Sequence, residues 1–169
     1  MTMPFPEPTQ PAAGRTEVFL RYLAYFREET LSKVAGLPEE ELRRSRLPSG
    51  WTPLELLKHL RYVELRWIEW GFEGRGIEEP WGDRRADRWY VAPDETRDAL
   101  SAALRAQGAH TGKVVANSPL DAVGAPGPRW VGAEPATLER VLFHMLQEYA
   151  RHLGHLDVVS ELAGGPVGE

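Results

Sequence analysis

The sequence contains no cysteine among its 169 residues. Disulfide bonds, a cysteine nucleophile and a cysteine-ligated zinc finger are therefore excluded, and any sulfur chemistry must use a thiol from outside the chain. Basic charge is also scarce, because 20 lysines and arginines stand against 25 acidic residues, for a net charge of -5. This balance argues against nucleic acid as a partner, since nucleic-acid-binding domains carry basic patches.

Long apolar runs are missing as well. No run approaches the roughly 20 residues of a membrane span, and the first residues, "MTMPFPEPTQPAAG", lack the features of a secretory signal. We therefore expect a cytoplasmic protein without a membrane partner. The length suits one domain over residues 1–169, with the proline-rich residues 1–14 as a loose tail.

Apolar residues recur at helical spacing in four stretches, and no convincing pair of strands is visible. In the second stretch Thr52, Pro53 and Glu55 form the signature of a capping box with proline at the first helical position. Asp94 is the expected N-cap of the third. We predict an all-α fold, a four-helix bundle, whose helices cover about Arg15–Ala35, Pro53 to Gly71 or Gly74, Asp94 to about Val114, and Ala136–Ala163.

The last predicted helix carries His144, Glu148, His152 and His155 at spacings of four, four and three. At about 100° per residue these side chains share one narrow face, which borders the apolar face of the helix. Imidazoles and a carboxylate at the edge of a core need partners, because burying them unpaired is costly. A metal ion is one partner that satisfies several of them at once.

A second helix offers a further ligand. His59 lies among Leu56, Leu60 and Val63, so it should point toward the interior of the bundle. One ligand from this helix and two from the last, four residues apart, make a workable three-ligand site. Such a site leaves coordination positions for water or substrate, as catalytic metal sites do.

Ordinary interpretations of these residues stay open. Each histidine could be a satisfied core or surface group, and Glu148 could pair with Arg140 or Arg151 along its helix. His110 should be exposed. The arginines between Arg84 and Arg88 could bind an anionic substrate or could form a solvated loop.

Two strings, "GWTPLELLKHLRYVELRWIEWGF" and "TLERVLFHMLQEYARHLGHLDVVSELAGG", resemble the DinB-like superfamily of metalloenzymes, and its mycothiol-dependent branch most closely. The resemblance implies up-down-down-up topology and a metal held by His59, Glu148 and His152. Where the common family pattern has a histidine, this chain has Glu148, as in the maleylpyruvate isomerase-like branch. A divalent zinc, nickel or iron ion suits such a site.

The resemblance also implies a metal-dependent transferase that joins a low-molecular-weight thiol, of the mycothiol or bacillithiol type, to an electrophilic small molecule. We expect His155 close to the metal as a proton-handling catalytic group and His144 one turn further away. Two alternatives remain: a metal-dependent hydrolase of a small ester or amide, and a non-catalytic metal-binding stress protein. A homodimer is a further option.

Overall fold

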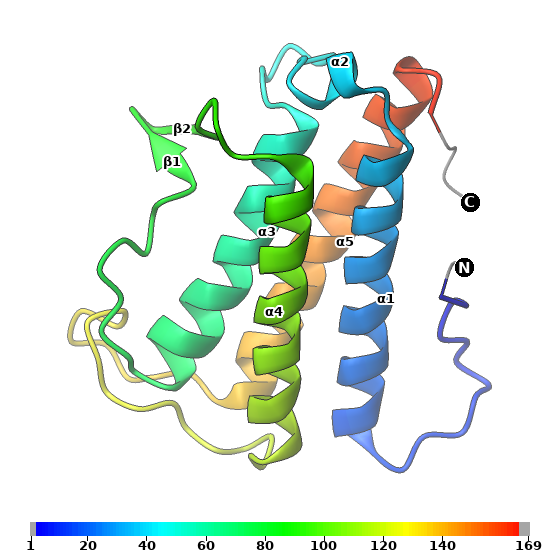
Figure 1. Cartoon of the computed structure of the whole chain (residues 1–169). Helices are drawn as coiled ribbons and strands as arrows, with labels where there is room; N and C mark the ends of the chain where they lie inside the picture. The colour runs from blue at the N-terminus through cyan, green and yellow to red at the C-terminus, as the bar shows by residue number, and fades with distance from the viewer. Residues whose placement is uncertain (1–2, 166–169) are drawn as a thin grey trace.

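The computed structural model describes residues 3–165, and this part of the chain is mostly helical (Figure 1). The predicted all-α class is confirmed, since the only described strands have two residues each. None of the described helices is both long and apolar enough to cross a membrane. The elements in chain order are α1 (Arg15–Gly36), α2 (Glu39–Leu42), α3 (Pro53–Trp67), the π-helical turn η1 (Ile68–Phe72), β1 (Arg84–Arg85), β2 (Arg88–Trp89), α4 (Arg97–Ala116) and α5 (Leu138–Leu162).

Four long helices surround one core. α1 packs against α4 and α5, and α3 packs against the same two helices (Figure 1). Each helix directs its apolar stripe inward, as the helical period of the sequence predicts. Removing these side chains from water is the main stabilising contribution to the fold. The fully buried residues include Leu23 and Val34 of α1, Leu56, Leu57 and Leu60 of α3, Leu104 of α4, and Leu142, Met145 and Tyr149 of α5.

The start of α3 has the predicted capping box. The Oγ1 atom of Thr52 accepts a hydrogen bond from the backbone N–H of Glu55, and Glu55 accepts one from the backbone N–H of Thr52 at 2.8 Å. Pro53 occupies the first turn, where its missing N–H costs nothing. The cap thus fixes where α3 begins, and with it the position of His59 two turns later.

We expect Thr52→Ala to lower the free energy of unfolding by about 1 kcal/mol, because it removes the side-chain acceptor of the cap. Urea denaturation followed by circular dichroism measures the change. Thr137→Ala is the matched control, since Thr137 precedes α5 without making a side-chain cap hydrogen bond. Equal losses in the two variants would contradict a specific role for the Thr52 cap.

Two local predictions are wrong. The N-cap of α4 is Thr96 and not Asp94: Thr96 has extended backbone angles, and its Oγ1 accepts from the N–H of Ala99 at 3.2 Å. No convincing pair of strands is expected from the sequence, but β1 and β2 pair as a short antiparallel hairpin. Its turn residues Ala86 and Asp87 both have positive φ angles, 50° and 59°, as a tight hairpin turn requires. Neither is glycine or asparagine, so the usual hairpin signal is missing.

The amino-terminal segment lies against α1. The ring of Phe5 contacts Tyr22 and Tyr25 edge-on, at centroid distances of 5.8 and 5.2 Å. Residues 3–14 form no helix or strand. The proline-rich segment predicted as a loose tail is therefore irregular, and an aromatic contact holds it to the bundle.

Candidate metal centre

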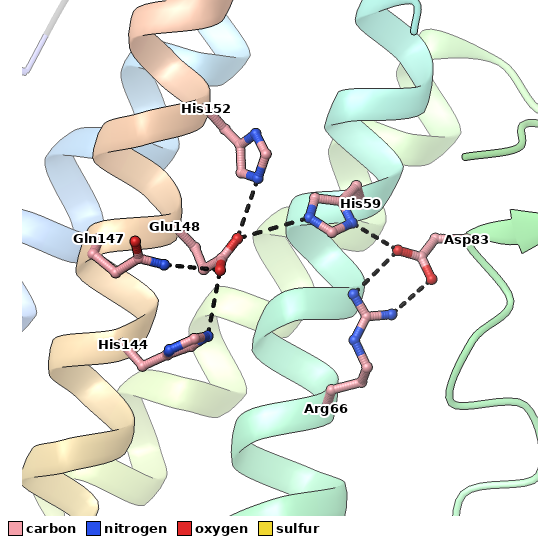
Figure 2. Close-up of polar contacts among 7 residues, drawn as sticks. All are labelled: His59, Arg66, Asp83, His144, Gln147, Glu148 and His152. Carbon is pink, nitrogen blue, oxygen red and sulfur yellow. Dashed lines mark hydrogen bonds and ion pairs between the residues drawn. The ribbon is translucent and has the colours of Figure 1, made fainter. Parts of the chain in front are cut away.

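The structure brings His59, Glu148 and His152 together across the gap between α3 and α5 (Figure 2). Glu148 and His152 lie one turn apart on α5, and both face His59 on α3. The Oε2 atom of Glu148 is 3.1 Å from His152 Nε2 and 3.9 Å from His59 Nε2. One ligand atom from each of the three residues lies within 4.8 Å of the other two. The convergence expected from the helical spacing is thus present.

The electrostatics of this cluster favour the protonation states that bind metals. The polar interactions with His152, and then with His59, hold the pKa of Glu148 far below its ordinary value. Burial lowers the pKa of His152 despite the opposing effect of Glu148. At neutral pH the cluster therefore presents a carboxylate and a neutral imidazole, which are the ligand forms that a metal ion requires.

A buried aspartate outside the predicted set orients His59. The side chain of Asp83 is fully buried, and its Oδ2 atom lies 2.9 Å from His59 Nδ1 (Figure 2). Arg66 donates two hydrogen bonds to the same carboxylate, at 2.6 and 3.1 Å. Burial raises the pKa of Asp83, but the bonds to His59 and Arg66 outweigh this effect and lower it overall. The ionised carboxylate fixes the proton on Nδ1 of His59, which leaves Nε2 free to face Glu148.

We expect Asp83→Asn to weaken metal binding by about 10-fold to 100-fold, because the amide holds the His59 tautomer less firmly and leaves Arg66 without a counter-charge. Competition with a chromogenic chelator measures the affinity. Asp87→Asn is the control: Asp87 is exposed in the same hairpin, and asparagine tolerates its positive φ angle. Unchanged affinity in Asp83→Asn would show that the aspartate only supports the loop.

Aromatic side chains pack against the candidate metal ligands. The indole of Trp89 stacks on the His59 ring at a centroid distance of 4.3 Å and meets His152 edge-on at 5.2 Å. All three residues line a cleft of about 340 Å³, together with Glu148 and Trp67. The candidate ligands are therefore mostly buried but open to a cleft that could admit a small molecule.

Comparison with known proteins identifies the family of the chain. A family model described as mycothiol S-transferase matches residues 18–165. The chain belongs to the mycothiol S-transferase family. Among solved structures, a DinB-like protein from Bacillus cereus ATCC 10987 has a TM-score of 0.61 at 18% identity, covering 89% of this chain and 94% of that one. At this identity the likeness concerns the fold alone. No curated protein matches the sequence.

The two remaining histidines of α5, His144 and His155, lie in the opposite order to the prediction: His144 is nearer to the cluster of candidate ligands. His144 Nε2 is 3.3 Å from Glu148 Oε1, and the His144 ring packs on Trp67 at 4.4 Å. His155 is exposed, with its ring centroid 6.2 Å from that of His152. The expectation of His155 near the metal and His144 further away is wrong, because Trp67 and Glu148 hold His144 in the cluster. A catalytic role for His155 remains a prediction.

The donor set fits the divalent transition metal implied for this family. Two imidazoles and one carboxylate form a common three-ligand set for zinc and related ions. Atoms bound to one ion at about 2.0–2.2 Å lie at most about 4.4 Å apart, and the separations of 3.1 and 3.9 Å from Glu148 meet this limit.

His110 is the remaining histidine. It is half-buried and not exposed as predicted, because it bonds Glu73 at 2.6 Å.

Proposed function

We propose that this protein is a metal-dependent transferase that joins a low-molecular-weight thiol, of the mycothiol or bacillithiol type, to an electrophilic small molecule. The observation that carries the proposal is the convergence of two imidazoles and one carboxylate in an open cleft. The family assignment supports mycothiol as the thiol. The absence of cysteine from the chain is consistent with a thiol supplied from outside.

In this proposal His59, Glu148 and His152 hold a zinc, nickel or iron ion. A bound ion with an open position supplies a Lewis acid, which lowers the pKa of a thiol and keeps it as the nucleophilic thiolate. Asp83 keeps the proton of His59 on Nδ1. Glu148 is held by Gln147, which donates to its Oε1 at 2.8 Å, and by His144. Trp89 covers one side of the cluster by stacking on His59.

The proposal includes the arrangement of the domain. We infer a single domain with a four-helix bundle of up-down-down-up topology. Figure 1 supports this topology, since the colours of α1 and α5 advance along the molecule in one direction and those of α3 and α4 in the other. A cytoplasmic location also belongs to the proposal, because that compartment keeps small thiols reduced.

The test has two measurements on the purified protein. Elemental analysis should find one divalent metal ion per chain, and mycothiol with an electrophile such as monochlorobimane should give the thioether faster than the uncatalysed reaction. Treatment with a chelator should abolish the difference, and added metal should restore it. Turnover of small esters or amides without any thiol would instead indicate a hydrolase. A bound metal without either activity would indicate a non-catalytic metal-binding protein.

A further inference from the structure

We infer that Arg129, Arg84 and Arg151 form an oxyanion site beside the candidate metal ligands, and that the electrophilic substrate carries a carboxylate or a phosphate. The inference rests on the proposed function and names the substrate class for the same cleft. Its starting point is charge: the three arginines line the cleft of the metal cluster, and Glu148 is the one acidic residue in that lining.

The positive charge of these arginines is not neutralised within the protein. Arg66, which also lines the cleft, is paired with Asp83. Within residues 3–165 no carboxylate forms an ion pair with any of the other three arginines, and Glu148 is occupied by its histidines. Three guanidinium groups thus face one engaged carboxylate. An anion entering the cleft would supply the missing counter-charge.

Arg129 is held in position for this role. Its guanidinium lies over Trp67 at 4.4 Å from the ring centroid and over Trp70 at 5.4 Å. Its Nε atom is buried and has no hydrogen-bond partner. Burial and the charge of Arg66 lower the pKa of Arg129, which reflects a cation without a compensating anion. A guanidinium fixed on aromatic rings with unused donors is preorganised to bind a carboxylate or phosphate.

The loop that carries Arg129 is anchored to the end of the α3 segment. The indole N–H of Trp130 donates to the carbonyl of Gly71 at 3.1 Å, and the N–H of Ala125 donates to the carbonyl of Phe72 at 2.7 Å. These bonds attach the loop to η1, directly after Trp67. Arg129 is therefore fixed relative to the metal cluster although it lies in an irregular segment.

Trp67 places the oxyanion site next to the metal ligands. One part of its side chain supports Arg129, and its ring centroid also lies 4.4 Å from that of His144, which contacts Glu148. Arg84 lies over Trp81, at 5.4 Å from the ring centroid, and Arg151 lies on α5 beside His152. A small electrophile bound by its anionic group could thus keep its reactive carbon toward the candidate metal ligands.

The first arm of the test measures binding without catalysis. Succinate and its neutral diamide, succinamide, are titrated into the metal-free protein while tryptophan fluorescence is recorded, since Trp67, Trp81 and Trp89 line the cleft. Inorganic phosphate is titrated in parallel, and the tighter binder identifies the preferred oxyanion. Succinate or phosphate should bind and succinamide should not. Arg129→Gln should weaken the binding of succinate or phosphate about 10-fold or more.

The second arm compares iodoacetate with iodoacetamide as electrophiles for mycothiol. In each reaction a sulfur–carbon bond forms, the carbon–iodine bond breaks, iodide leaves, and the thiol proton passes to solvent. Arg129→Gln should lower kcat/KM for iodoacetate about 10-fold to 100-fold and leave that for iodoacetamide nearly unchanged. Because the chain has no cysteine, neither reagent consumes a protein thiol.

Controls keep the two proposals separable. Arg84→Gln and Arg151→Gln alter exposed side chains and should reproduce smaller losses if Arg129→Gln fails to fold. Arg21→Gln on α1, which contributes no residue to the cleft, should change nothing. Anion binding without transfer of either electrophile would remove the proposed function and leave the oxyanion site intact. Equal effects of Arg129→Gln on both electrophiles, or an effect confined to the KM of the thiol, would overturn the inference.

Discussion

Replacing His152 by alanine is expected to reduce the metal content of the purified protein to background, with the affinity for the ion falling by more than about 100-fold. Loss of an outer partner of a metal ligand already lowers the metal affinity about 10-fold to 100-fold, and His152 is itself one of the three candidate ligands. The variant also removes the 3.1 Å hydrogen bond that holds Glu148. Elemental analysis and titration with Zn²⁺ measure the effect.

His59→Ala should behave in the same way, because it removes the one ligand that α3 contributes. His110→Ala is the matched control: its imidazole bonds Glu73, away from the cluster, and it is absent from the cleft lining. Circular dichroism should show that all three variants keep their helices. If His59→Ala and His152→Ala both retained full metal content while folded, the ligand assignment would be wrong.

The three candidate ligands could be found from the sequence because helical periodicity fixes the face that they share and the family resemblance selects His59, Glu148 and His152 on it. Glu148 and His152 are four residues apart, so any α-helix brings them to one face. The apolar neighbours of His59 place it on the inner side of α3. The direction of each side chain is thus set by its own helix, and the core decides which faces meet. Their role as metal ligands stays a prediction for the experiments above.

The supporting residues could not be found in this way. Asp83 and Arg129 lie in irregular segments, where no period relates sequence position to direction. The bond between His59 and Asp83 spans 24 residues, and its formation depends on a hairpin whose turn lacks the usual glycine or asparagine. The order of His144 and His155 was likewise open, because both lie near one edge of α5. Trp67 from another helix decides it through its contact with His144.

Glu64→Gln is expected to destabilise the fold by about 3–5 kcal/mol, the cost of leaving one member of a buried ion pair without its partner. Glu64 is fully buried on α3 and connects all four long helices. It accepts hydrogen bonds from Arg27 of α1 at 2.9 Å, Thr111 of α4 at 2.5 Å and Tyr149 of α5 at 2.5 Å. The variant keeps the size of the side chain, removes the charge and replaces one acceptor oxygen by an amide N–H donor. Urea denaturation measures the loss.

A double variant separates the cost of the unpaired charge from the value of the pair. In Glu64→Gln the guanidinium of Arg27 stays mostly buried, with 11% of its side chain exposed, and has lost its counter-charge. Adding Arg27→Met removes that charge and replaces it with an apolar chain of similar length, so the double variant should recover much of the lost stability. The single variant Arg27→Met completes the comparison. If the stability losses of Glu64→Gln and Arg27→Met simply added in the double variant, the carboxylate and the guanidinium would act independently. Glu64 would then contribute through its bonds to Thr111 and Tyr149 alone.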